Sequence, residues 1–326
     1  MRNTLTLSHN KHIVDNKNKD VGFMDASSAL EHYSDLAGNW IDPYPKPVID
    51  VYDGISVVRD DLLTGSKVRG ADCLISKLIL QHPDIDTLVY VQPRFGLAGV
   101  SILDVAKRYG LKVKLFMPAS KRISHHQASC IEQGADVEFH RIAAMPNLNL
   151  IAEKWASQRD NAFFIPLGLK HKLVTAGFVH VARQIPETEE VWTVVITGVL
   201  HRSFQIAWPN VHCNAVAVAL NMKAGEVGHD RIHSHPLAFT KGIKEDEMPP
   251  FPSMATYDAK CWKYIPKNRP EENHWMWNVG REPSLIDTAI FDRTDSYRDW
   301  GDKRDLLFYS SADLPPACYN TYMFRG

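Results

Sequence analysis

Lys67 stands at a point in the chain where a lysine can become reactive. It lies in V-V-R-D-D-L-L-T-G-S-K-V-R-G-A-D, residues 57–72, two residues after Gly65. The apolar run, the acidic turn and the glycine predict that a helix starts at this lysine. Backbone N–H groups at a helix start disfavour a positive charge and so lower the pKa of a nearby amine, which suits Schiff-base chemistry. Spacing alone favours the alternative of a solvated lysine in a loop.

The same segment resembles a family signature. It is similar to the K-R-D-D-L-x-x-x-G-N-K-x-R-K motif of pyridoxal-phosphate (PLP) enzymes of the tryptophan-synthase-β fold, called fold type II. The nearest branch is the 1-aminocyclopropane-1-carboxylate deaminase and D-cysteine desulfhydrase group. The matching residues are Arg59, Asp60, Asp61, Leu62, Gly65, Lys67 and Arg69. Ser66 replaces the usual asparagine and Gly70 a lysine. In that family the lysine at the Lys67 position carries PLP as an internal aldimine, so the resemblance implies PLP as the cofactor.

A second segment, T-Y-D-A-K at residues 256–260, resembles the D-P-x-Y-[E/T]-G-K segment of the deaminase branch. The resemblance implies that Tyr257 faces the substrate and assists proton transfer, and that Asp258 contacts the pyridine nitrogen. A carboxylate at that nitrogen keeps it protonated, and a protonated ring withdraws electrons from Cα. Without the resemblance, the pair would be a strand-end tyrosine and a solvated aspartate.

The phosphate site is expected after the apolar run V-W-T-V-V-I. The family uses a loop of the form G-S-G-G-T-x-x-G there, whereas this chain has T-G-V-L-H-R-S at residues 197–203. The cofactor-binding residues that the resemblance implies, besides Lys67 and Asp258, are Gly198, Val199, Leu200, His201, Arg202 and Ser203. Val199 and Leu200 are bulky and resist positive φ angles, so Arg202 and Ser203 are expected to add a charge and a hydroxyl. The alternative is an ordinary strand-to-helix loop.

The expected substrate loop is Q-P-R-F-G-L-A-G, residues 92–99. The deaminase branch has S-N-H-x-R there, which binds the substrate carboxylate and packs on the ring. The candidate substrate residues of this chain are Arg94, which could hold an anion, Phe95, which could stack, and Gly96. The lost serine, asparagine and histidine imply a different substrate, unless this is simply a variable loop.

His229, His233 and His235 form the one cluster with metal-ligand spacing. The i, i+4 spacing of the first two could place two imidazoles on one helix face. No glutamate accompanies them, and Pro236 follows at once. These features favour a solvent-facing loop, and we expect no metal site.

Strand-like and helical segments alternate along the chain. Strands are expected at residues 86–92, 111–118, 135–140, 162–166 and 191–198, and helices at 97–110, 127–135, 150–157 and 177–185. This alternation predicts an α/β fold with parallel sheets flanked by helices. By resemblance, residues 1–70 and 185–326 form a large PLP-binding domain and residues 71–184 a small α/β domain. The charged residues 285–326 are expected to be a C-terminal extension.

Composition sets the broad class of the protein. The 326 residues carry a net charge of -1, so the whole chain has no electrostatic signature for nucleic acid. No apolar run approaches the roughly 20 residues that span a bilayer, and the first residues lack an apolar signal core. The five cysteines are widely spaced without a C-x-x-C, which indicates a reducing cytoplasm. Dimers are the habit of the resembled family, so a homodimer is expected.

These features together predict a PLP-dependent lyase that acts at Cα of an amino-acid-like small molecule through an internal aldimine on Lys67. Elimination, deamination and decarboxylation remain open, because each begins with a bond to Cα aligned with the ring. The chain is also similar to PLP enzymes of bacteriophages that hypermodify thymine. By that alternative, the protein works in the host cytoplasm on an amino acid attached to a base, with DNA as partner. A third alternative is a non-catalytic relative that has lost the cofactor.

Overall fold

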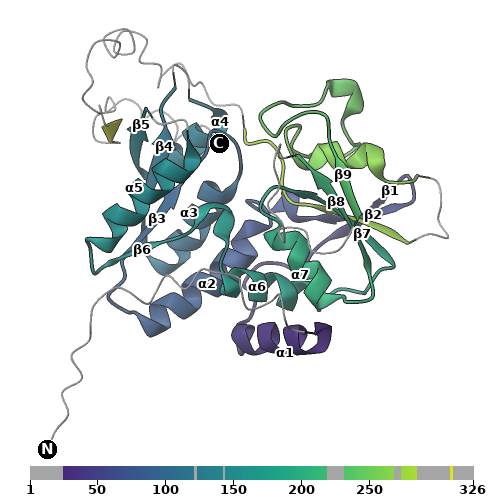
Figure 1. The fold of residues 1–326 in the computed structure, drawn as a ribbon, viewed down its shortest axis with the longest axis horizontal. Helices are drawn as coiled ribbons and strands as arrows, with labels where there is room; N and C mark the ends of the chain where they lie inside the picture. The colour runs from purple at the N-terminus through teal and green to yellow at the C-terminus, as the bar shows by residue number, and fades with distance from the viewer. Residues whose placement is uncertain are drawn as a thin grey trace, which may run out of the picture.

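The chain folds around two separate β-sheets. The computed structural model describes residues 25–120, 123–141, 144–218, 231–267, 273–284 and the backbone of 309–310. Figure 1 shows the sheets in different halves of the molecule, with helices between and around them. The strands are β1 Ile49–Tyr52, β2 Ile55–Arg59, β3 Thr87–Val91, β4 Lys112–Pro118, β5 Asp136–His140, β6 Ala162–Phe164, β7 Glu190–Val195, β8 His212–Ala217, β9 Arg231–Ser234, β10 His274–Asn278 and β11 Tyr309–Ser310.

Both sheets are mostly parallel. The larger has the order β1-β2-β10-β7-β8-β9, in which β1 and β2 form an antiparallel pair and all other neighbours are parallel. The smaller has the order β11-β5-β4-β3-β6, in which only β11 runs antiparallel to its neighbour. The carboxyl ends of parallel strands lie at one edge of a sheet, so the loops that follow them gather there. The predicted α/β class with flanking helices is therefore confirmed.

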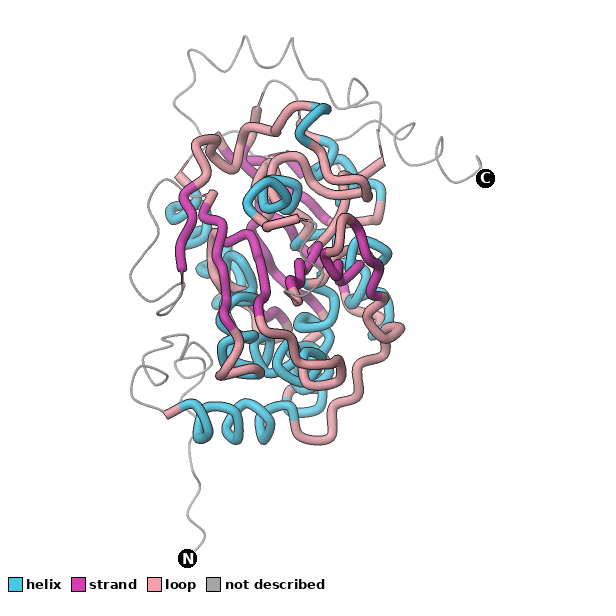
Figure 2. Tube along the Cα trace, turned by 90° about the vertical axis from the view of Figure 1, so that its right-hand side faces the viewer, coloured by secondary structure: helices cyan, strands magenta, loops and turns pink. Residues whose placement is uncertain are grey.

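Helices cover the sheets and join them. They are α1 Ala26–Ala37, α2 Lys67–Gln81, α3 Ala98–Tyr109, α4 His125–Glu132, α5 Met145–Ser157, α6 Lys172–Ala182 and α7 Val199–Ala207. Short 3-10 turns span Asp60–Leu62, Leu167–Leu169, Glu245–Glu247 and Asp258–Tyr264. Helix α1 packs on α6 and α7, and Figures 1 and 2 both show it lying along one end of the molecule.

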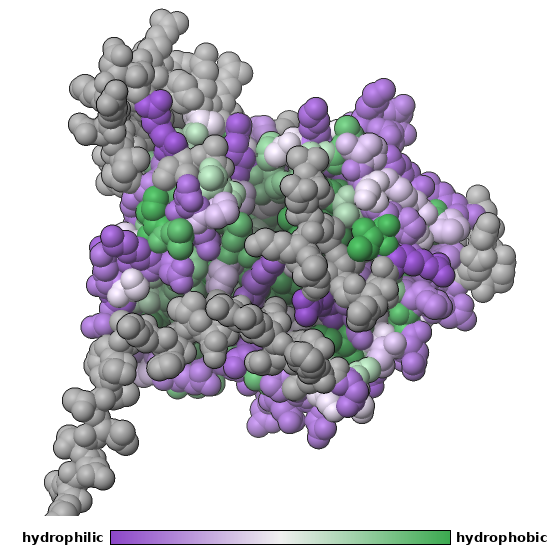
Figure 3. Space-filling view, in the orientation of Figure 1, coloured by the Kyte–Doolittle hydropathy of each residue, from purple (hydrophilic) through white to green (hydrophobic). Residues whose placement is uncertain are grey.

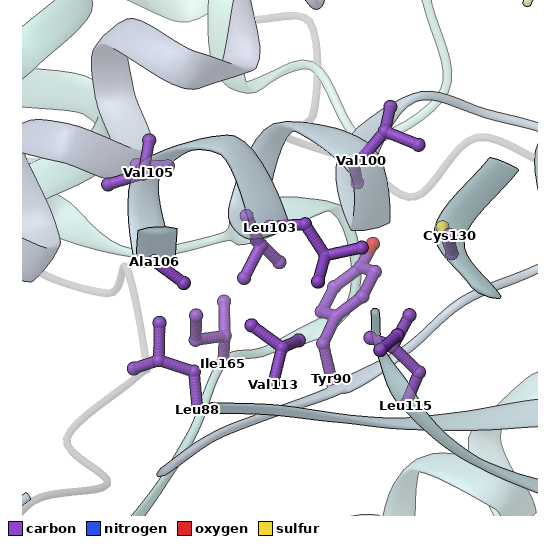
Figure 4. Packing of buried hydrophobic residues seen from close by; sticks show 14 of the residues in the cluster. Leu88, Tyr90, Val100, Leu103, Val105, Ala106, Val113, Leu115, Cys130 and Ile165 are labelled. Atoms are coloured by element: carbon purple, nitrogen blue, oxygen red, sulfur yellow. The ribbon is translucent and has the colours of Figure 1, made fainter. Parts of the chain in front are cut away.

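Alternation along β3 fixes the two faces of the smaller sheet. Leu88 and Tyr90 belong to the cluster that packs against α3, whereas Val89 and Val91 pack against α5. Figure 4 shows Leu103 and Ala106 of α3 pointing down toward the strands. Burying an apolar side chain of this size stabilises the fold by about 1.5–3 kcal/mol, so both helices are held firmly. The sheet is thus covered on both faces, as a parallel sheet requires.

Two glycines allow α2 and α6 to touch. A Cβ placed on Gly70 would lie 2.6 Å from Val174 Cγ1 and 2.9 Å from the Val174 carbonyl oxygen. A Cβ on Gly177 would lie 2.8 Å from the Cβ of Cys73. Because α2 also packs on α3, and α6 on α7, this close crossing connects the two halves of the molecule. It also fixes the axis of α2, whose first residue is Lys67.

We expect Gly70→Ala to destabilise the protein by about 1–3 kcal/mol, since the added methyl group must push the two helices apart. Chemical denaturation of the variant would measure this loss in free energy of unfolding. Ser76→Ala, a change of similar size on a partly buried position of the same helix, serves as the control. A Gly70→Ala variant as stable as this control would mean that the crossing accommodates a side chain.

Most predicted elements are confirmed, with shifted ends, but one prediction is wrong. The segment with His233, expected as a solvent-facing loop, is strand β9, which pairs parallel with β8 at the edge of the larger sheet. Its sequence R-I-H-S has little periodicity, so the pairing depends on neighbours distant in sequence. His233 packs against Trp192, with ring centroids 5.0 Å apart, and its Nε2 lies 3.2 Å from Asn214 Oδ1. His229 lies outside the described residues.

Candidate active site

Lys67 lies where loops from both sheets meet around two adjoining cavities. The larger, called the Lys67 cavity below, has a volume of about 270 Å³, and the small cavity has about 40 Å³. Lys67, Gly168, Thr197, Tyr257 and Val279 line both. Gly168 follows β6, Thr197 follows β7 and Val279 follows β10, so the cavities lie at the carboxyl ends of parallel strands. Open α/β sheets bind ligands at this place.

The other residues of the Lys67 motif hold the start of α2 in position. Arg69 is buried and donates hydrogen bonds to Asp60 Oδ1 at 3.0 and 3.1 Å, and it also pairs with Asp42. Trp277 of β10 donates to Asp60 Oδ2 at 2.8 Å and to Ser66 Oγ at 3.1 Å. Buried charges are stable only when paired in this way. The motif therefore ties the first turn of α2 to the larger sheet.

Arg59 and Asp61 complete this support. Arg59 Nε and Nη2 donate to the two oxygens of Asp61 at 2.8 and 2.9 Å, a bidentate pair. Asn278, at the end of β10, also donates to Asp61 at 2.8 Å. None of these three residues lines a cavity that Lys67 lines. The matched motif thus contains one residue with an accessible reactive atom and several that place it.

The amine of Lys67 is in an environment that disfavours its charge. Burial lowers its pKa from the usual 10.5 to about 8, and no carboxylate of a described residue forms an ion pair with it. Nζ donates a hydrogen bond to the carbonyl oxygen of Gly168 at 3.2 Å. The side chain keeps some accessible surface because it borders the cavities, although protein atoms surround it. A neutral, accessible amine is a nucleophile, so Lys67 is suited to attack a carbonyl carbon.

We expect Lys67→Met to stabilise the ligand-free protein by up to about 3 kcal/mol at pH 7. Folding of the wild type must bury a charged amine, and the methionine variant avoids this cost. The gain in stability of the variant should be complete below pH 8 and disappear towards pH 10.5. Between these values the Lys67 amine of the wild type is protonated in the unfolded chain and neutral in the folded one. Denaturation of wild type and variant at pH 7 and 10 would measure it. Lys154→Met, at an exposed lysine, should show no such difference; equal pH profiles for both variants would contradict the lowered pKa.

Helix α7 begins at the small cavity. Gly198 precedes it with a φ of 68°, a left-handed conformation that glycine adopts without strain, and Val199 is the first helical residue. Gly198, Val199, Leu200 and His201 line the small cavity. The first intrahelical bond of this helix runs from the Arg202 N–H to Gly198 O, so the N–H groups before Arg202 belong to the open first turn. Such a helix end attracts an anion.

The structure brings only part of the predicted phosphate segment to the cavity. Val199 and Leu200 have helical rather than positive φ angles, so their bulk causes no backbone strain. Arg202 and Ser203 are not among the lining residues of either cavity. Ser203 Oγ instead donates to Val199 O, one turn earlier, at 2.8 Å.

Tyr257 shares the cavity walls with Lys67, and Asp258 does not reach them. Tyr257 lines both cavities, and its hydroxyl donates to Val194 O at 2.8 Å. Burial raises the pKa of this phenol. Asp258 is completely buried and is not on either cavity wall. Neither oxygen of its carboxyl group has a well-formed hydrogen bond, and burial raises its pKa well above the usual value, although the N–H groups of Val279 and Gly280 lower it.

Aromatic side chains form the outer part of the Lys67 cavity. Phe95, from the loop before α3, meets Phe239 edge-to-face at 6.1 Å between ring centroids, and Phe239 meets Tyr257 in the same way at 6.3 Å. The chain at Phe239 is held by Lys260, a buried lysine whose Nζ donates to Leu237 O at 3.2 Å and to Ala238 O at 2.8 Å. Burial lowers the pKa of Lys260 to about 8.

The predicted substrate residues separate into two groups. Phe95 and Gly96 line the Lys67 cavity, whereas Arg94 is exposed and outside its lining, with its guanidinium carbon 6.0 Å from the centroid of the Phe95 ring. Gly168, Thr197 and Phe239 also line the cavity and were not predicted. A methyl group on Gly168, which has a φ of 75°, would lie 2.5 Å from Thr197 Cγ2, so this close approach requires glycine. The P-L-G that ends at Gly168 was the only sequence signal for it.

The described part of the chain contains no group of three or more histidine, cysteine, aspartate or glutamate side chains suited to a metal ion. No helix in the described ranges combines the length and apolar character needed to cross a bilayer.

Comparisons with known proteins identify the fold. No protein-family model and no curated protein sequence matches the chain. A solved ACC deaminase homologue matches with a TM-score of 0.67 and 14% identity, over 81% of this chain and 98% of that one. Threonine deaminase isoform 2 from Solanum lycopersicum matches with a TM-score of 0.57 and 16% identity, over 84% of this chain and 90% of that one. A pyridoxal 5'-phosphate-dependent aspartate racemase matches with a TM-score of 0.57 and 13% identity, over 80% of this chain and 96% of that one.

The chain therefore has the two-domain fold of fold type II PLP enzymes, as the sequence predicted. At these identities the matches establish the fold and not the reaction. The DNA-directed alternative stays a prediction.

Proposed function

We propose that this protein is a PLP-dependent lyase in which Lys67 forms the covalent bond to the cofactor and then acts as the base at the amine-bearing carbon. The observation that carries the proposal is the Lys67 amine itself. It borders two cavities at the carboxyl ends of both sheets, and burial lowers its pKa to about 8. The fold is that of enzymes that include a PLP-dependent racemase and two deaminase-type proteins. PLP, when bound, withdraws electrons from the carbon next to the amine.

The first turn of α7 would hold the phosphate group. The backbone N–H groups of Val199, Leu200 and His201 belong to a helix start beside Lys67, and a helix start favours a dianion. Gly198 provides the sharp turn that aims them. Arg202 is one residue further along the helix, so we assign the phosphate to the backbone donors and not to its guanidinium.

Asp258 would partner the pyridine nitrogen. A completely buried carboxyl group without a well-formed hydrogen bond is costly unless a cation or a donor reaches it. A protonated ring nitrogen would be such a cation, and the charge of the carboxylate would keep the proton on it. Tyr257, the preceding residue, lines the cavity and Asp258 does not, so we expect the Tyr257 ring to move or to pack on the cofactor.

One basic side chain is available for proton transfer. Among the described residues that line the Lys67 cavity, Lys67 is the only one with a charged or readily charged nitrogen. The hydroxyls of Thr197, Tyr90 and Tyr257 also line this cavity, but a neutral hydroxyl is a much weaker base than a neutral amine. A racemase needs proton donors on both faces of the carbon, whereas an elimination or deamination needs one base. The single amine therefore favours a lyase.

Reduction with borohydride tests the proposal directly. The protein, incubated with PLP and gel-filtered, should be yellow, and borohydride should remove the visible absorbance and fix the cofactor on one lysine. Mass spectrometry of the digest should find that lysine to be Lys67. Attachment to another lysine, such as the buried Lys260, would refute the assignment. A protein that stays colourless with saturating PLP would instead be the non-catalytic relative.

A further inference from the structure

The wall of the Lys67 cavity is divided by polarity. Three of its polar side chains, Lys67, Thr197 and Tyr257, also line the small cavity, whereas Tyr90 and Gln92 line the larger cavity alone. Most of the other lining residues are apolar, and their larger side chains include Phe95, Leu97, Met145, Ile196, Phe239 and Met254. Figure 3 shows apolar residues inside the hollow in the middle of the molecule, between the two halves. A ligand with its amine at Lys67 would place its other end among these apolar side chains.

A side chain of the protein already binds part of the helix start that could receive a substrate carboxylate. Gln92 follows β3, and its Oε1 accepts a hydrogen bond at 2.8 Å from the N–H of Gly99, in the first turn of α3. Its Nε2 donates to Pro93 O at 2.9 Å and to Gly96 O at 3.0 Å. A Cβ on Gly99 would lie 2.5 Å from Gln92 Oε1, so a side chain here would displace the carboxamide. The carboxamide therefore takes the Gly99 N–H, one of the donors that an external anion would use at this helix end.

Among the described residues of the cavity wall, no side-chain cation is left to bind a substrate carboxylate. Among the described lining residues, Lys67 carries the only cationic group, and the proposed function uses it for the cofactor. Arg94, the nearest arginine in sequence, is exposed and lies outside the lining. Burying a carboxylate without a cation or a set of N–H donors is expensive. The cavity is therefore built for an apolar group and not for an anion.

We infer that the amine substrate of this site carries an aromatic ring, which packs against Phe95 and Phe239, and that its recognition does not depend on a carboxylate. The inference rests on the proposed function, which places the substrate amine at Lys67. The two phenylalanines already meet edge-to-face, at an interplanar angle of 86°, and Phe239 meets Tyr257 at 88°. Rings in this arrangement present both faces and edges to a third ring. Aromatic groups prefer to pack edge-to-face or offset-stacked, and both contacts are available here. A small polar amino acid would leave this surface uncovered.

Calorimetric titration of the PLP-loaded protein would test the inference without measuring turnover. The probes are 2-phenylethylamine, ethylamine, L-phenylalanine and L-alanine. Each phenyl compound should bind about 10- to 100-fold more tightly than its small counterpart, the ratio expected for burying one aromatic side chain. L-Phenylalanine and 2-phenylethylamine should agree within about tenfold, because the carboxylate has no cation to bind. L-Alanine binding as tightly as L-phenylalanine, or a larger advantage of L-phenylalanine over the amine, would overturn the inference.

Variants locate the aromatic contact. Phe239→Ala should reduce the affinity for 2-phenylethylamine by about tenfold and leave that for ethylamine within about threefold. Phe239→Leu keeps an apolar side chain without the ring and should show an intermediate loss, which provides a result if the alanine variant does not fold. Phe164→Ala is the matched control, since this half-buried phenylalanine packs near α5, away from the cavity. Equal losses in Phe239→Ala and Phe164→Ala would overturn the inference.

The outcomes separate this inference from the proposed function. If borohydride fixes PLP on Lys67 and the small amino acids bind best, the inference fails and the proposed function stands. If PLP does not attach to Lys67, both fail.

Discussion

Lys67→Ala is expected to abolish covalent attachment of PLP and to lower turnover on the order of a thousandfold or more. The variant lacks the amine that would bond to the cofactor, and also the single base of the cavity wall; a positioned base alone contributes about 10²–10⁴-fold. The visible absorbance of the PLP-loaded protein should be lost, and turnover of an aromatic amine would be followed by product analysis. The fold should persist, because the buried pairs of Arg69 and Arg59 that position α2 do not involve Lys67.

Lys263→Ala provides the control for this experiment. Lys263 is exposed, is close in sequence to the Tyr257 segment, and lines neither cavity. Its removal should change neither the absorbance nor the rate. If Lys67→Ala remained as yellow as the wild type after gel filtration with PLP, a different lysine would bind the cofactor.

Asp258→Asn should have opposite effects with and without PLP. In the PLP-loaded protein, loss of the negative charge at the ring nitrogen should slow the chemical step about 100-fold or more, the scale of one well-placed electrostatic partner. In the ligand-free protein the amide should be stabilising at neutral pH, because the buried carboxyl group has a raised pKa and must stay protonated while the unfolded one ionises near 3.8. Wild-type stability should therefore fall as the pH rises above about 4, and the variant should lose this dependence.

Rapid-mixing kinetics would measure the first effect and denaturation from pH 4 to 8 the second. Asp246→Asn, at an exposed carboxylate, should alter neither quantity. Normal turnover of Asp258→Asn would exclude it as the pyridine partner, whatever its effect on stability.

The local signals in the sequence were sufficient for most of the fold. The start of α2 at Lys67, the strands β3 and β4 and the stop of α3 before Gly110 each follow from periodicity and a terminating residue. The edge strand β9 could not be predicted, because its R-I-H-S sequence is mostly exposed and gains its conformation from pairing with β8. Strand identity at a sheet edge depends on a neighbour that is distant in sequence.

The candidate site was predictable where residues share a motif. Lys67 and Tyr257 were both expected at the cofactor and substrate site, and both line the same cavity. Thr197 and Phe239 were not expected, because each reaches the cavity from a loop whose path depends on the two sheets. The substrate loop was expected to bind an anion through Arg94, but local sequence does not determine the direction of an exposed side chain. Gln92 carried no signal at all, since its role needs the turn between β3 and α3.

The two hydrogen bonds of Lys260 have a consequence for how substrate range could change. They attach the backbone just before Phe239 to the same short turn that follows Tyr257, so these two rings are carried by one unit of the chain. Lys67 and its supporting ion pairs belong to another unit, anchored on α2 and β10. Substitutions around Lys260 could therefore reshape the aromatic wall as a block while the reactive amine keeps its place. A laboratory search for altered selectivity should begin at residues 237–239 and not at the Lys67 motif.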